Sequence, residues 1–103
     1  MTETINKIKA ALEEAYAEHF RLDGAFAVSQ QRIGIFEREI EFIQKHPRYN
    51  APDEKTLNRC IEEEKKFSSE IVEKIYDLED LIKSLETSCR FAELFEERYL
   101  EEK

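Results

Sequence analysis

Residues 46–53 read His46-Pro47-Arg48-Tyr49-Asn50-Ala51-Pro52-Asp53, and they contain both prolines of the 103-residue chain. Proline lacks the N–H group of a helical hydrogen bond, and it disfavours helix in the residue before it. Asn50 or Asp53 is suited to cap a following helix, with Pro52 in its first turn. The segment therefore predicts a corner at 47–52 between two helices, at about 3–46 and about 53–101.

The residues before the corner carry an apolar stripe whose spacings alternate between three and four. Such spacing keeps one narrow face toward a partner helix in a left-handed coiled coil. Gly24 and Gly34 lie off the stripe, and each costs about 1 kcal/mol relative to alanine, so we expect them to weaken this helix without ending it. The stripe consists of Ile5, Ile8, Leu12, Ala15, His19, Leu22, Phe26, Ser29, Ile33, Phe36, Ile40 and Ile43.

A matching stripe follows the corner, and its polar positions are flanked by further apolar residues. The stripe consists of Leu57, Ile61, Glu64, Ser68, Ile71, Ile75, Leu78, Ile82, Leu85, Cys89, Ala92, Glu96 and Tyr99, with Cys60, Phe67, Leu81 and Phe95 beside it. If the chain folds back near residue 50, the numbers of contacting residues add to about 100. The two stripes predict an all-α fold, a long antiparallel two-helix coiled-coil hairpin that makes residues 1–103 a single domain.

Both halves carry apolar side chains beyond those that the seam needs, which is unusual on a solvated monomer and predicts a second interface. Val28, Ile35 and Phe42 recur every seven residues on one flank of the first helix, and Tyr16 and Phe20 lie on the other. The C-terminal part adds Phe91, Leu94, Phe95, Tyr99 and Leu100.

The favoured interpretation of this surplus is a homodimer that forms a four-helix assembly. One alternative is a monomer in which a short third helix starts near Thr87 or Ser88, and another is obligate partnership with a different protein. For partner binding we select Val28, Ile35, Phe42, Phe91 and Phe95 on the apolar flanks. The corner residues Arg48 and Tyr49 are a separate candidate, because exposed arginine and tyrosine are favoured in binding hot spots.

Negative charge is concentrated after the corner. Residues 1–52 hold 8 acidic and 7 basic side chains, and residues 53–103 hold 16 acidic and 9 basic ones, giving −1 and −7. This balance argues against direct binding of a phosphate backbone, which needs clustered positive charge. A solvated face explains the carboxylates most simply, but they also suit a basic groove on a nucleic-acid-binding protein. The outward face of the second helix presents Glu62, Glu63, Glu70, Glu73, Asp77 and Asp80.

Side chains with reactive chemistry are few and far apart. Cys60 and Cys89 are separated by 29 positions on one expected helix, about 43 Å, so we expect two free thiols and a reducing compartment, the cytoplasm. His19 lies on the stripe, opposite Leu81 and Ile82 in the expected register, where it would set the register or respond to pH. We expect no catalytic site, metal or cofactor.

Ser29, Glu64 and Ser68 interrupt the stripes, and we expect them to specify how the two helices align, because polar seam residues disfavour wrong registers. No apolar run approaches the roughly 20 residues that span a bilayer, and the first residues do not resemble a secretory signal. The Trp-x-Gly turn of WXG-type helical hairpins is absent, and the sequence identifies no family.

The sequence therefore predicts a non-enzymatic protein–protein interaction module, an adaptor or regulatory subunit that acts through its apolar flanks and self-associates. The alternative function is that of an acidic, phage-type inhibitor, which mimics nucleic acid and occupies a basic site on a host protein.

Overall fold

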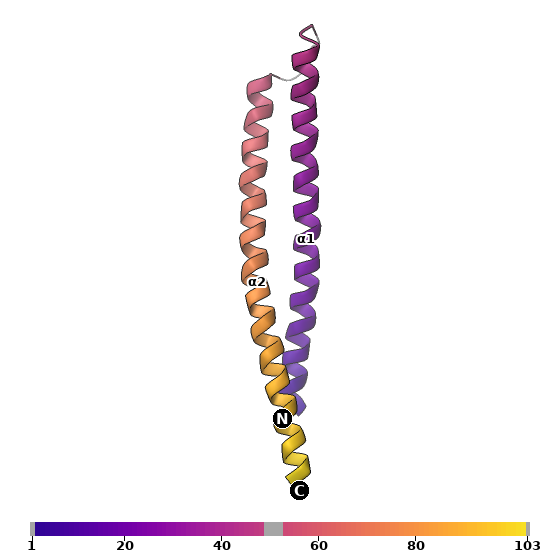
Figure 1. Ribbon diagram of the computed structural model, residues 1–103, viewed down its shortest axis with the longest axis vertical. Helices are drawn as coiled ribbons and strands as arrows, with labels where there is room; N and C mark the ends of the chain where they lie inside the picture. Colours follow the sequence, from indigo (N-terminus) through magenta and orange to yellow (C-terminus); the bar gives the residue numbers. More distant parts are fainter. Residues whose placement is uncertain (1, 49–52, 103) are drawn as a thin grey trace. The chain divides into compact units, whose positions relative to one another are not determined.

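The computed structural model describes residues 2–48 and 53–102, with side chains for all of these except Glu97 and residues 99–102. It contains helix α1, Thr2–Lys45, and helix α2, Glu54–Glu102 (Figure 1). Each bound lies within one residue of the helix ranges that the sequence predicts, about 3–46 and about 53–101. The predicted all-α helical hairpin is confirmed, whereas the four-helix assembly stays a prediction.

Local sequence accounts for both helix ends at the corner. The N–H of His46 donates to the carbonyl of Phe42 at 2.9 Å, the last helical bond of α1 before Pro47. Asp53 is the N-cap of α2, because its carbonyl accepts from the N–H of Leu57 at 3.1 Å and its carboxylate accepts from the N–H of Lys55 at 3.2 Å. Of the two predicted caps, Asp53 is thus the one that the structure shows. Asn50 lies outside the described residues.

Both helices are continuous where the sequence contains possible interruptions. Helix α1 passes through Gly24 and Gly34, neither of which has a positive φ, so the expectation that they do not end the helix is confirmed. Helix α2 passes through Thr87 and Ser88, so the third helix considered as an alternative is wrong. Neither residue is followed by a proline or a glycine that would stop the preceding helix.

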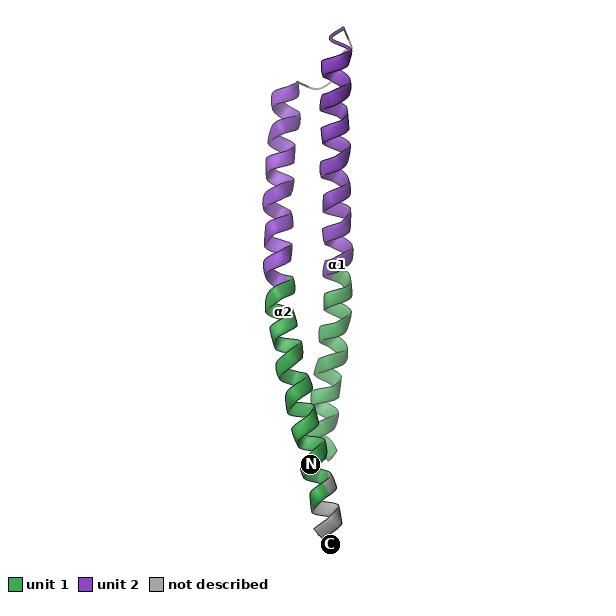
Figure 2. Cartoon of the chain, viewed as in Figure 1, with its two compact units in different colours: residues 1–21, 75–103 green, residues 22–74 purple. Residues whose placement is uncertain are grey.

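The chain divides into two compact units, each an antiparallel pair of helix segments (Figure 2). Unit 1 consists of residues 1–21 and 75–103, and unit 2 consists of residues 22–74. In unit 2, the partners Gln44 and Glu54 have numbers that add to 98, and in unit 1 Tyr16 and Glu86 add to 102. The pairing therefore follows the expected register of about 100 in both units, while the single-domain organisation stays a prediction.

The core of each unit is the seam between its two helix segments. Every described side chain of the two predicted stripes is buried or half-buried. In unit 1 the buried apolar residues are Ile5, Ala15, Ile82 and Cys89, and in unit 2 they are Ile33, Leu57, Ile61 and Ile71. Of the apolar residues beside the second stripe, Phe67, Leu81 and Phe95 are exposed, whereas Cys60 is half-buried.

Candidate interaction surfaces

A polar layer crosses the seam of unit 2 where both stripes carry serine. The hydroxyls of Ser29 and Ser68 lie 2.6 Å apart, and the Ser29 side chain is completely buried. The amide of Gln30 donates to the Ser68 hydroxyl at 3.2 Å, and Ser29 lies 3.4 Å from the carbonyl oxygen of Glu64. The hydroxyls thus satisfy one another inside the seam, which is the condition under which buried polar groups are tolerated.

Glu64 completes this layer, but its partly buried carboxylate has few polar contacts to offset the loss of hydration. Its Oε1 atom is buried without a hydrogen-bond partner among the described residues. The nearest cation, Nη1 of Arg32, is 3.7 Å away, within ion-pair distance but beyond that of a hydrogen bond. The structure therefore brings Ser29, Glu64 and Ser68 together, as expected for alignment-specifying residues, although that role itself stays a prediction.

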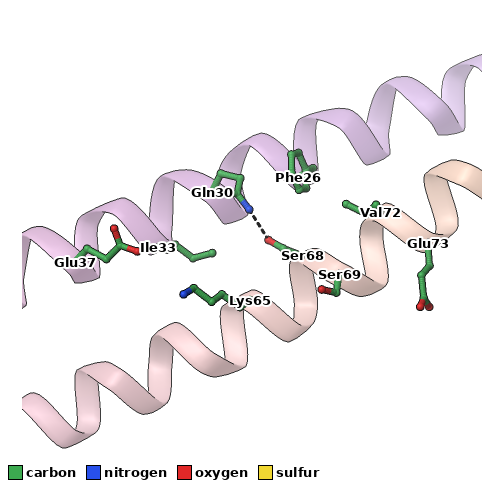
Figure 3. A pocket seen from close by; sticks show the side chains of 9 residues that line it. All are labelled: Phe26, Gln30, Ile33, Glu37, Lys65, Ser68, Ser69, Val72 and Glu73. Atoms are coloured by element: carbon green, nitrogen blue, oxygen red, sulfur yellow. Dashed lines mark hydrogen bonds between the residues drawn. The ribbon is translucent and has the colours of Figure 1, made fainter.

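An open groove of about 630 Å³ lies beside the polar layer in unit 2. Figure 3 shows the hydrogen bond between Gln30 and Ser68 at its centre, with Glu73 pointing away from α1. Its lining residues include two serines, two glutamates and one lysine, and no histidine or cysteine is among them. The lining consists of Phe26, Gln30, Ile33, Glu37, Lys65, Ser68, Ser69, Val72 and Glu73.

Polar side chains also connect the two helices of unit 1. Nε2 of His19 lies 3.1 Å from Oε1 of Glu79, with the histidine side chain 27% exposed. The expected position of His19 opposite Leu81 and Ile82 stays a prediction, and the structure adds a polar contact that the sequence did not suggest, from a carboxylate beside the stripe of α2. The Tyr16 hydroxyl donates to Glu86, and this hydrogen bond raises the pKa of the tyrosine.

Sequence reasoning missed these flank partners, yet a signal for them exists. Glu79, Glu86 and Glu93 recur every seven residues on α2, and their partners His19, Tyr16 and Lys9 descend along α1 in the opposite direction. Flanking positions of antiparallel helices meet across the seam, so a heptad of carboxylates opposite donors predicts such contacts.

The selected apolar flank of α1 is exposed in unit 2. Val28 is 46% exposed, Ile35 57% and Phe42 43%. The Phe42 ring also lies 4.4 Å from that of His46, between ring centroids. From α2 of the same unit, Phe67 is 46% exposed. Unit 2 therefore exposes apolar side chains from both of its helix segments.

The selected C-terminal residues are exposed in unit 1. Phe91 is 67% exposed and Phe95 57%, and with Leu94 and Arg98 they line a hollow of about 240 Å³. On α1 of this unit, Tyr16 and Phe20 are also exposed, whereas the side chains of Tyr99 and Leu100 lie outside the described part. A second hollow, between the helices, combines apolar and acidic residues: Ala11, Glu14, Ala15, Glu18, Leu78, Leu81 and Leu85.

All six carboxylates of the proposed acidic face are exposed. None of them forms an ion pair or hydrogen bond with another side chain in the described ranges 2–48 and 53–98. Four belong to unit 2 and two to unit 1. Lysines interrupt the face, among them the exposed Lys66 and Lys74. The residues are Glu62, Glu63, Glu70, Glu73, Asp77 and Asp80.

The remaining candidates are less informative. Arg48 is exposed in the turn after α1, and Tyr49 lies outside the described residues. Cys60 is half-buried and Cys89 buried, both as free thiols, and burial raises the pKa of Cys89, with a further contribution from nearby Glu93. Within residues 2–48 and 53–98, no cluster of three potential metal ligands occurs. No helix, over its described length, is apolar enough to cross a bilayer.

Comparison with known proteins provides no relative for this chain. No protein-family model, curated protein or solved structure matches it.

Proposed function

We propose that this chain is a non-enzymatic protein–protein interaction module, an adaptor or regulatory subunit that self-associates through its apolar flanks. The exposure of large apolar side chains carries the proposal. Among the described residues, eleven large hydrophobic side chains are exposed, whereas eight hydrophobic residues are buried. Single exposed apolar residues are ordinary, but large apolar side chains that recur on one flank of a helix, as Val28, Ile35 and Phe42 do, are typical of an interface.

The limited seam of each unit supports the same conclusion. Two packed helices bury only one stripe each, and much of the stability of a helix in a protein comes from such packing. Burying a large apolar side chain contributes about 1.5–3 kcal/mol, so covering several exposed ones would add substantially to a small fold. Self-association supplies this burial without another protein. Two free thiols suit a reducing compartment, which we propose to be the cytoplasm.

Sedimentation velocity tests the proposal directly. We expect the chain to sediment at micromolar concentration with twice its mass of 12.3 kDa. Val28→Ser combined with Phe42→Ser, or Phe91→Ser combined with Phe95→Ser, should weaken the dimer at least 10-fold if that flank lies in the interface. Each of these side chains is already partly covered in the single chain, so each pair removes about 1.5 kcal/mol or more of the apolar burial gained on association.

Ala27→Ser combined with Gln31→Ser is the matched control, since both residues are exposed on α1 and belong to no apolar flank. This variant should sediment like the parent chain. A chain that remains monomeric at about 100 μM, well above the dissociation constants of stable dimers, would count against self-association.

The exposed carboxylates favour a second candidate function, that of an acidic inhibitor that mimics nucleic acid. Six carboxylates with no partner among the described side chains are available to a basic groove, and such pairing guides association electrostatically. The interspersed lysines weaken the same field, which is why this function ranks second.

Charge reversal tests the inhibitor function. Glu73→Lys combined with Asp77→Lys should reduce binding to a basic nucleic-acid-binding protein from the native host by 10-fold or more at low salt, and by less at high salt, because salt screens exposed charges. The control Lys66→Glu, on the same helix, should preserve or strengthen binding. Unchanged binding of the charge-reversed chain would remove this candidate.

A further inference from the structure

Helix α1 carries a second stripe with coiled-coil spacing, beside the one that packs on α2. Its members lie three and four residues apart: Ala25, Val28, Arg32, Ile35, Glu39 and Phe42. All belong to unit 2. At 3.6 residues per turn, this stripe lies about a third of a turn around α1 from the seam. We call it the outer stripe.

The large apolar members of the outer stripe are exposed, whereas Ala25 and Glu39 are half-buried. Val28, Ile35 and Phe42 are each between 43% and 57% exposed. The Arg32 side chain is 57% exposed, even though it is within ion-pair distance of Glu64. A stripe of apolar residues at one heptad position, with charged residues at the next, is the arrangement of a helix that packs on another helix.

The order of charges along the outer stripe makes it complementary to itself. If a second α1 packs antiparallel, with Ile35 meeting Ile35, then Val28 lies beside Phe42 of the other copy. Arg32 then lies beside Glu39 of the other copy, and the same contacts repeat on the other side of the two-fold axis. A parallel pairing would instead bring arginine to arginine and glutamate to glutamate, at an electrostatic cost.

We propose that a second copy of this chain docks on the outer stripe, α1 against α1 and antiparallel, with the two Ile35 side chains at the two-fold axis. This inference rests on the proposed self-association, and it specifies the surface and the direction. The C-terminal residues Phe91 and Phe95 are then not required for the dimer contact.

Cysteine cross-linking of the full chain tests the direction. The background is Cys60→Ala with Cys89→Ala, and mild oxidation is followed by non-reducing electrophoresis. We expect Ile35→Cys to form a covalent dimer, because disulfides need α-carbons within about 7 Å. Val28→Cys alone should not, because two copies of residue 28 would lie about 21 Å apart, whereas Val28→Cys with Phe42→Cys should. Glu37→Cys, exposed about half a turn around α1 from Val28, measures random collision.

Sedimentation of Ile35→Asp separates this inference from the proposal beneath it. We expect the dissociation constant of the dimer to rise about 100-fold or more, because both copies lose apolar burial at the axis and two carboxylates meet there. A parent chain that dimerises, and still does so after Ile35→Asp, would overturn the inference while self-association stands. A covalent dimer from Val28→Cys alone would overturn the antiparallel direction. A parent chain that stays monomeric would overturn both the inference and the proposed self-association. If a different protein binds the outer stripe at Ile35 and no second copy does, that protein replaces the second copy as the occupant.

Discussion

Ile33→Asp is expected to leave most molecules unfolded at 25 °C, whereas Ile35→Asp, two residues away on α1, is expected to leave them folded. Ile33 is 7% exposed in the seam of unit 2, and Ile35 is 57% exposed on the outer stripe. The first substitution removes about 1.5–3 kcal/mol of apolar burial and places an unpaired carboxylate in the seam. A total loss of about 4 kcal/mol or more is comparable with the whole stability of a small domain.

Far-ultraviolet circular dichroism during urea titration measures this difference. The experiment is done at low protein concentration, where dimer formation would add little to the free energy of unfolding. The effect of Ile35→Asp then reflects the stability of the single chain alone. It should then shift the free energy of unfolding by less than about 1 kcal/mol, as surface substitutions do. Equal destabilisation by both substitutions would mean that Ile35 packs inside the chain, contrary to the structure.

Much of the fold was predictable from sequence because a two-helix seam depends on few variables. The spacing of Ile5 through Ile43 defines one face, and the prolines at 47 and 52 place the reversal. Once the helices reverse at a known position, antiparallel geometry determines which residues meet. Ser29 and Ser68, whose numbers add to 97, lie within one layer of the expected register, and the structure places their hydroxyls 2.6 Å apart.

The polar contacts were less predictable because they depend on flanks and on long side chains. His19 pairs with Glu79, which lies beside the stripe of α2, because the long glutamate side chain reaches over a neighbouring position of the seam. Gln30 reaches Ser68 in the same way. The binding surfaces are a different case: Ile35 is 57% and Phe91 67% exposed, but the exposure of an apolar side chain does not identify the partner that covers it.

Glu64→Leu is expected to stabilise the chain by about 1–3 kcal/mol, raising the midpoint of thermal unfolding by several degrees. Glu64 occupies a seam position, its side chain is 16% exposed, and its buried Oε1 accepts no hydrogen bond from the described residues. An ion pair of 3.7 Å with the exposed Arg32 compensates little for this desolvation. Leucine would remove the buried charge and add apolar burial, and Arg32 would remain solvated.

Glu63→Leu is the matched control, because this neighbouring glutamate is exposed and its removal changes no seam contact. Differential scanning calorimetry at low concentration should show a higher midpoint for Glu64→Leu alone. A lower midpoint would mean that the Glu64 carboxylate contributes net stability to the layer with Ser29 and Ser68. If the midpoint rises as expected, glutamate at this position costs stability. We propose that this cost is offset by alignment. With leucine at position 64 the seam should then tolerate a shifted register, and hydrogen exchange should show less protection around Ser68 than in the rest of the stabilised chain.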